Sequence, residues 1–199
     1  MRHLLAPVVL AACVVSACTP AVEEPTTAPP SSPTASVSAS PSPTPEPSPS
    51  PTVAESFPPA PASESPEQAA VRAAWMEYWR VRSEFVADPT LTDLTPTQAV
   101  TTGEAQDLIL RTIRTLRESG SRSTGGLVFR NVEVGEPASG ATEATVSYCL
   151  DRGNLSLVDA DGKPIASEGP TTLTETTTLS LGADGIWRVA QIRNEPAAC

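Results

Sequence analysis

Histidine is almost absent from this chain. The only imidazole belongs to His3, within an N-terminal segment, residues 1–17, that we expect to be removed on export. A mature chain without histidine cannot hold a Ser-His-Asp or Cys-His catalytic centre, or a metal site with histidine ligands. Carboxylates, tyrosines and arginines are the groups that remain for chemistry.

Positive charge is also scarce. The chain has 13 Lys and Arg against 23 Asp and Glu, a formal net charge of −10, and Lys163 is its only lysine. No cluster of basic residues stands out. Affinity for nucleic acid comes largely from neutralising phosphates, and electrostatic docking on anionic lipid needs similar basic clusters. We therefore expect neither nucleic acid nor an anionic membrane surface as an electrostatic partner.

Two further patterns are missing. The four cysteines show no C-x-x-C spacing, so a redox-active pair is not expected. The apolar run from Leu4 to Ala17 is too short to cross about 30 Å of hydrocarbon as a stable helix. It does have the length of the apolar region of a signal peptide.

The residues that end this run resemble a known processing signal. Val15-Ser16-Ala17-Cys18 is similar to the lipobox of bacterial lipoproteins, in which an aliphatic and two small residues precede a cysteine. The resemblance implies cleavage before Cys18 and a diacylglycerol on its thiol. Two or three acyl chains would then anchor the protein stably at the extracytoplasmic face of the cell membrane.

Two alternatives to Cys18 stay open. Leu10-Ala11-Ala12-Cys13 also fits the lipobox pattern. Cleavage there would leave a very short signal and an apolar remnant, residues 14–17, on the mature chain, so we favour Cys18. The other alternative is an ordinary secretory signal in which both cysteines are incidental.

Proline is concentrated in one segment. Of the 22 prolines, 14 lie between Thr19 and Glu64, among Ser, Thr, Ala and Glu. This composition cannot bury enough apolar surface to offset the entropy of ordering it. We expect residues 18–64 to form a disordered tether, which would reach on the order of 140 Å if fully extended. Residues 65–199 hold every Trp and Tyr and are predicted to form one domain.

The apolar residues of the domain are first spaced as in helices and later alternate with polar residues as in strands. Ser65-Pro66-Glu67-Gln68 is typical of a helix start with a capping box, and the apolar period then continues to about Val86. A short helix is predicted from Thr95 and a third helix up to Gly120. The predicted strands span 127–134, 142–151, 171–182 and 186–194. This order predicts an α+β fold in which two or three N-terminal helices pack on a curved four-stranded antiparallel sheet.

The layout resembles the cone-like nuclear transport factor 2-like (cystatin-like) fold. The local text is also similar to small secreted lipoproteins of actinobacteria, which show V-x-x-C-x-D, then D-x-D-G-K, then W-x-V. The residues that fit are Val146, Cys149, Asp151, Asp159, Asp161, Gly162, Lys163, Trp187 and Val189. The resemblance covers about 66–199 and implies the fold. That family is functionally uncharacterised, so no mechanism follows from it.

Export would leave two thiols, Cys149 and Cys199, in an oxidising compartment. In an antiparallel meander the second and fourth strands run the same way, so both cysteines lie near one sheet edge. Two strand spacings are only about 10 Å, which a short tail can span. We predict a Cys149–Cys199 disulfide, worth about 4 kcal/mol in the chain-entropy model.

A pocket inside the cone is the remaining candidate site. Folds of this type include ketosteroid isomerase, whose pocket uses Asp and Tyr. If the loop of the Asp184-Gly185 hairpin has an even number of residues, Glu175 and Arg188 lie on the same face of the last two strands as the apolar residues. They could then line a cavity with Trp75 and Tyr78 from the first helix. A satisfied internal ion pair is the alternative, and an odd loop would turn one strand over.

No metal or cofactor is expected. Asp159-Ala160-Asp161-Gly162 lacks the later oxygen ligands and the closing Glu of a calcium loop, so a turn explains it better. We therefore expect a membrane-anchored cell-envelope lipoprotein with a non-catalytic domain that binds an envelope protein or a small apolar ligand. The alternative is a pocket enzyme of isomerase or dehydratase type that uses a carboxylate and a Tyr.

Overall fold

The computed structural model describes residues 53–196 and residue 199. Cys13, Cys18 and residues 19–52 of the expected tether lie outside the described residues. The predictions of signal cleavage, of lipidation and of disorder in that segment therefore stay predictions.

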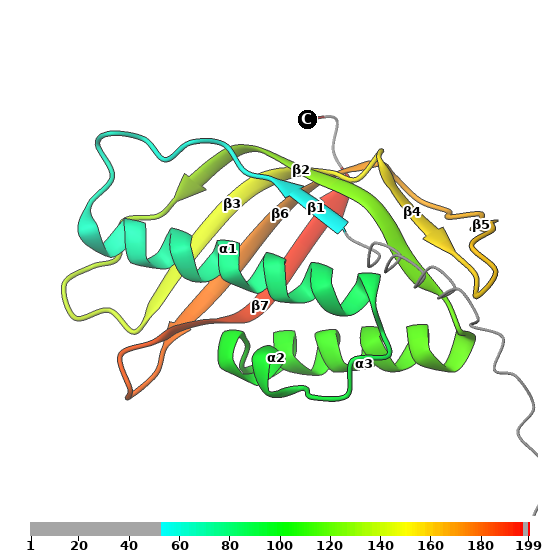
Figure 1. Ribbon diagram of the computed structural model, residues 1–199. Helices are drawn as coiled ribbons and strands as arrows, with labels where there is room; N and C mark the ends of the chain where they lie inside the picture. Colours follow the sequence, from blue (N-terminus) through cyan, green and yellow to red (C-terminus); the bar gives the residue numbers. More distant parts are fainter. Residues whose placement is uncertain (1–52, 197–198) are drawn as a thin grey trace, which may run out of the picture. The chain divides into compact units, whose positions relative to one another are not determined.

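Three helices lie on one side of a curved sheet (Figure 1). The helices are α1 (Pro66–Ala87), α2 (Thr95–Val100) and α3 (Gly103–Ser119). The strands are β1 (Val53–Ser56), β2 (Arg122–Val134), β3 (Glu143–Asp151), β4 (Leu155–Val158), β5 (Pro164–Ile165), β6 (Thr172–Leu181) and β7 (Trp187–Pro196). The predicted fold class is confirmed: N-terminal helices pack on a curved antiparallel sheet.

The sheet is larger than the predicted four strands. Its order is β5-β4-β2-β3-β6-β7, and β1 pairs with β2 in parallel. The four predicted strands correspond to β2, β3, β6 and β7. The short strands β4 and β5 were missed because each depends on its neighbours: β4 pairs with the first half of β2, and β5 only with β4.

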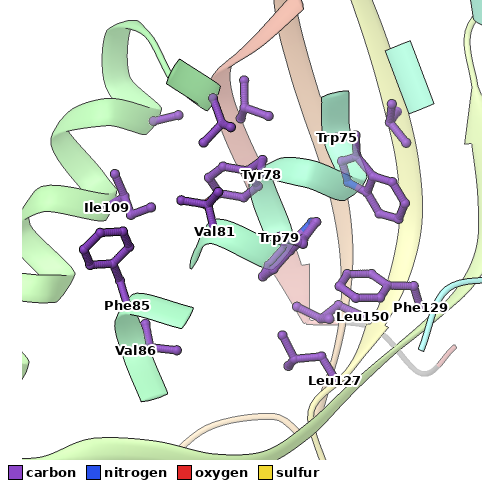
Figure 2. Packing of buried hydrophobic residues seen from close by; sticks show 14 of the residues in the cluster. Trp75, Tyr78, Trp79, Val81, Phe85, Val86, Ile109, Leu127, Phe129 and Leu150 are labelled. Atoms are coloured by element: carbon purple, nitrogen blue, oxygen red, sulfur yellow. The ribbon is translucent and has the colours of Figure 1, made fainter. Parts of the chain in front are cut away.

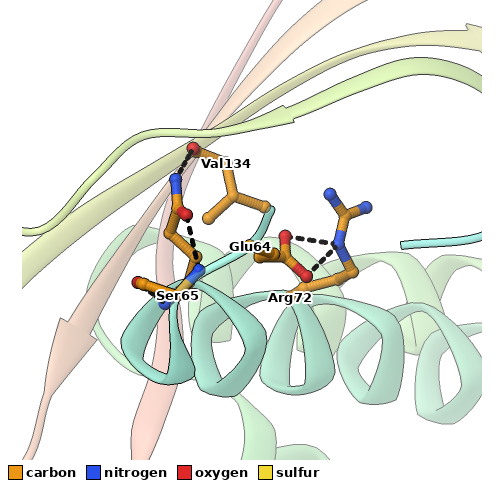
Figure 3. Close-up of polar contacts among 5 residues, drawn as sticks. Glu64, Ser65, Arg72 and Val134 are labelled. Carbon is orange, nitrogen blue, oxygen red and sulfur yellow. Dashed lines mark hydrogen bonds and ion pairs between the residues drawn. The ribbon is translucent and has the colours of Figure 1, made fainter. Parts of the chain in front are cut away.

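Helix α1 starts where the sequence predicts, and side chains fix its first turn (Figure 3). The Ser65 hydroxyl accepts from the Gln68 backbone N–H at 3.2 Å, and the Gln68 side chain accepts from the Ser65 N–H at 3.0 Å. The Gln68 amide also donates to the Val134 carbonyl at 2.9 Å. Buried Arg72 pairs with Glu64 at 2.8 Å. The start of α1 is therefore tied both to the preceding segment and to the end of β2.

The other two helices differ in how they begin and end. For α2, Leu94 is the N-cap and makes no side-chain cap bond; Asp93 instead accepts from the Thr95 N–H at 2.9 Å. The short helix thus begins at Thr95, as predicted, and the residue before it contributes no side-chain cap. Gly120 ends α3 in the left-handed region with φ of 64°, as predicted.

The folded domain includes residues 53–64, which the composition places in the tether. The boundary expected at 64 is therefore wrong. Strand β1 lies beside Gly125 and Gly126 of β2, and the Phe57 ring stacks on Phe129 with centroids 4.8 Å apart. Only tertiary pairing orders this segment, since its local composition predicts disorder.

The core joins α1 to the concave face of the sheet (Figure 2). Trp75 and Trp79 project from α1 toward the strands and contact Phe129 with ring centroids 5.2 and 5.1 Å away. Tyr148 of β3 closes the cluster, 4.9 Å from Trp75. Such aromatic groups dominate the energetics of a core. None of the helices within the described ranges is long and apolar enough to span a bilayer.

Candidate functional site

A pocket of about 210 Å³ opens between α1, α3 and the concave face of the sheet. Its inner wall is buried and its rim includes exposed Leu108 and Asn194. Its lining residues are Tyr78, Trp79 and Arg82 of α1; Leu108 and Thr112 of α3; Leu127, Leu150, Leu155, Leu173, Glu175, Ile192 and Asn194 of the strands; and Arg152, which follows β3. Such a concave, mostly apolar space with a few polar groups is the usual form of a small-molecule site.

Glu175 places a carboxyl group in the inner wall. Glu175 is 4 % exposed, and the Tyr148 hydroxyl donates a hydrogen bond to Glu175 Oε2 at 2.8 Å. That hydroxyl also lies 3.0 Å from Thr177 Oγ1. Burial raises the pKa of Glu175, and the bond from Tyr148 and the charge of Arg82 partly offset that rise. Glu175 therefore holds its proton to a higher pH than an exposed glutamate does.

Tyr78 contributes a second polar group from the α1 side. Burial raises its pKa to about 12, so the hydroxyl is neutral; Arg82 lowers and Glu175 raises this pKa by their charges. Tyr148, by contrast, donates to Glu175, and its burial and the charge of Glu175 raise its pKa well above the ordinary value. Within the described part of the chain, the Tyr78 hydroxyl forms no hydrogen bond, so it is available to a ligand.

Two arginines complete the polar lining. The Arg82 guanidinium lies 5.1 Å from the centroid of the Trp79 ring, within cation–π range. Arg152 donates from Nε to the Pro170 carbonyl at 2.9 Å. Both charges lower the pKa of Glu175, so both act on the same pocket.

The structure brings together only two of the four predicted pocket residues. Tyr78 and Glu175 line the pocket. Trp75 is fully buried in the aromatic cluster and does not line it.

Arg188 lies elsewhere, on the hairpin between β6 and β7. Leu181 pairs with Trp187, so the loop 182–186 between them has an odd number of residues. The side chains at the start of β7 therefore point to the opposite faces of the sheet from those predicted for an even loop. Arg188 pairs with Ser180 and forms an ion pair with Asp184 at 2.7 Å. A register shift between Thr178 and Leu179 then returns the even-numbered residues of β7 to the face of Glu175, which pairs with Asn194. For this reason Ile192 and Asn194, rather than Arg188, share the pocket with Glu175.

Sequence reasoning missed Arg82, Arg152 and Asn194. Arg82 could have been predicted, because it lies on the apolar face of the first helix. A charged side chain is unusual there and indicates a specific role. Asn194 could not be found, since its face depends on an odd loop and a bulge. Arg152 follows a strand in a turn, and no pattern fixes its direction.

The predicted disulfide joins Cys149 and Cys199, with the Cα atoms 5.9 Å apart. Cys149 stands between Tyr148 and Leu150, which face the core, so it lies on the other face of the sheet. The disulfide is thus on the convex side, away from the pocket.

The Asp159–Lys163 segment is a turn. Asp159 Oδ1 accepts from the backbone N–H groups of Asp161 and Lys163, at 3.0 and 2.8 Å. Among the described residues, no three His, Cys, Asp or Glu side chains are placed together so that they could hold a metal ion.

Comparison with known proteins gives structural neighbours only. No family model and no curated protein matches the chain. The intermembrane-space region of the chloroplast protein ARC6 is similar at 12% identity and a TM-score of 0.47, over 65% of this chain and 97% of that one. A ketosteroid isomerase-like protein from Erwinia carotovora atroseptica is similar at 16% identity and a TM-score of 0.44, over 68% and 100%. Aln2 from a Streptomyces species has 18% identity and a TM-score of 0.40, over 67% and 93%. Similarities at this level carry no conclusion about function.

Proposed function

We propose that this chain is a lipid-anchored protein of the cell envelope whose folded domain binds a small molecule in the pocket between α1, α3 and the sheet. The observation that carries the proposal is the polar inner wall of this pocket. The unpaired Tyr78 hydroxyl and the buried Glu175 carboxyl face a space walled by leucines and Trp79. A ligand in this space would accept a hydrogen bond from the Tyr78 hydroxyl, which has no partner among the described residues.

Native mass spectrometry tests the binding proposal. We would use the full chain with Cys13 and Cys18 changed to serine, so that it carries no acyl group, and expose it to an extract of small metabolites. A non-covalent adduct is expected, and Leu127→Trp, which fills the inner wall, should abolish it. If the unfilled pocket binds nothing, partner binding by an envelope protein becomes the better explanation of the domain.

The anchor rests on the sequence pattern around Cys18 and on the Pro-rich segment that follows. Two or more acyl chains would hold the chain at the membrane, and the tether would let the domain stand away from it. Intact-mass analysis of protein from the native host should show an N-terminus at Cys18 with acyl groups attached. Cys18→Ser should remove the modification and Cys13→Ser should not. A chain that still begins at Met1 would contradict this part of the proposal.

A pocket enzyme is the second candidate, favoured by one observation. Glu175 has a raised pKa and shares the pocket with the Tyr78 hydroxyl, which is the pairing of base and hydrogen-bond donor that proton transfer next to a carbonyl requires. Exchange of the α-protons of cyclohexanone in deuterated water provides a test. Catalysed exchange that Glu175→Gln abolishes would support an isomerase-type activity. Exchange at the rate of buffer alone would leave the binding function.

A further inference from the structure

The pocket holds two guanidinium groups that form no ion pair with a carboxylate of the described residues. Five arginines of the described chain form ion pairs: Arg72, Arg80, Arg130, Arg188 and Arg193. Arg82 and Arg152 form none with any described residue, although both line the same pocket. Glu175 lies close enough for both charges to lower its pKa, but not close enough to form an ion pair. Residues 53–196 therefore supply no direct counterion to these two cations at one concave site.

Both guanidinium groups are held in place by contacts that leave donors free. Arg82 lies over the Trp79 ring at 5.1 Å, a contact that occupies the face of the guanidinium and not its N–H groups. Arg152 uses Nε on the Pro170 carbonyl at 2.9 Å. An arginine has five N–H donors, so the terminal nitrogens of both residues remain for a ligand. Arginines fixed in this way lose little further entropy when they bind an acid.

We infer that the ligand of this pocket is an amphipathic carboxylic acid. Its carboxylate binds Arg82 and Arg152, and its apolar body packs on the leucines of the inner wall. This inference rests on the proposed function and names the ligand class for the same site. The leucines in question are Leu127, Leu150 and Leu173, which are 2, 4 and 8 % exposed and come from three neighbouring strands.

The charge count favours a monoanion over a phosphate. When Glu175 is ionised, two guanidinium charges balance its carboxylate and one carboxylate of the ligand. A phosphate monoester carries close to two negative charges at neutral pH, and the second would stand uncompensated beside Glu175. The volume of about 210 Å³ lies below the range of about 300–1,000 Å³ for drug-sized ligands. We therefore expect an acid that is smaller than a drug-sized ligand.

The negative charge of the whole chain does not oppose this assignment. A net charge of −10 repels anions at long range. At physiological ionic strength, however, charges more than about 8 Å apart are largely screened. The groups that line the pocket therefore decide which charge binds there.

Four probes with one apolar body and different head groups test the ligand class. Isothermal titration of the full chain, with Cys13→Ser and Cys18→Ser to prevent acylation, would compare octanoate, 1-octanol, octylammonium and octyl phosphate. Octanoate should bind at least about tenfold more tightly than each of the other three, since a hydrogen-bonded charge contributes about that factor. A preference for octyl phosphate, or equal binding of octanoate and 1-octanol, overturns the inference.

Arginine variants locate the carboxylate. Arg82→Gln and Arg152→Gln should each weaken octanoate binding about tenfold and leave 1-octanol binding unchanged. Arg114→Gln, an exposed arginine of α3 outside the pocket, is the matched control and should change neither. If 1-octanol binds and the arginine variants leave octanoate binding unaffected, the pocket still binds a small molecule, but the inference that its ligand is a carboxylic acid is wrong. If none of the four probes binds, the proposed function itself fails. The head-group comparison needs no variant, so it stays decisive even if a variant misfolds.

Discussion

At the scale of single residues, Glu175 and its neighbours determine what the pocket can do. Tyr148 donates to the Glu175 carboxyl from the core side, while Tyr78 faces the pocket without a hydrogen-bond partner in the described residues. The two tyrosines are almost equally buried, at 2 and 1 % exposure. They therefore form a matched pair in which only one hydroxyl contributes to the stability of the empty domain.

Replacing each tyrosine with phenylalanine measures that difference. Tyr148→Phe should lower the free energy of unfolding by about 1–3 kcal/mol, because it leaves a buried carboxyl without its donor. Tyr78→Phe should cost much less, since no hydrogen bond is lost. Urea denaturation of both variants provides the measurement. Equal losses of stability would contradict the described hydrogen bond.

The raised pKa of Glu175 predicts a particular dependence of stability on pH. A carboxyl that binds its proton more tightly in the folded state stabilises the fold at low pH. This contribution is lost as the pH rises from about 4.5, the ordinary value, through the raised pKa. The stability of the wild-type chain relative to Glu175→Gln should therefore fall over that window. The Glu175→Gln reference lacks only this titrating carboxyl, so the difference between the two chains belongs to Glu175. A relative stability that rises with pH would show that the pKa is lowered.

At the scale of helices and strands, local signals predicted some elements and missed others. The start of α1 was predictable because Ser65 and Gln68 bond within one turn. Strand β1 was not, because its order depends on pairing with β2, far along the chain. The pocket divides in the same way. Tyr78 follows from helical periodicity, whereas Asn194 and Arg188 depend on a loop of odd length and a bulge.

The first turn of α1 gives a prediction at this scale. Ser65→Ala should cost about 1 kcal/mol, because the Gln68 N–H loses its acceptor. Ser65→Asp keeps an acceptor at the N-cap and serves as the control. Thermal unfolding of the two variants should show a lower midpoint for Ser65→Ala only. Equal midpoints would mean that the cap adds nothing beyond the Gln68–Val134 contact.

At the scale of the whole domain, two devices hold the sheet around the pocket. The aromatic cluster fixes α1 on the concave face, and the disulfide ties the end of the chain to β3 on the other side. Strand β7 stands at the sheet edge and supplies Ile192 and Asn194 to the pocket. The disulfide closes the chain just beyond this strand, so it should protect the pocket from fraying at its open edge.

Removal of the disulfide tests this arrangement. Cys149→Ser combined with Cys199→Ser should lower the free energy of unfolding by about 4 kcal/mol in the chain-entropy model, for a sequence separation of 50. Hydrogen exchange should also increase at β7 before it increases at β3. Uniform exchange along both strands would contradict a local role for the disulfide at the sheet edge.

A ligand in the pocket would lie beside Trp79, and the indole N–H signals of the three tryptophans report on its binding directly. Trp79 lines the pocket, while Trp187 lines a different groove beside α1 and α2. A two-dimensional nitrogen–proton NMR titration of the full chain with octanoate should shift the Trp79 indole signal saturably and leave Trp187 unchanged. An unmoved Trp79 signal, or a shift confined to Trp187, would contradict the account.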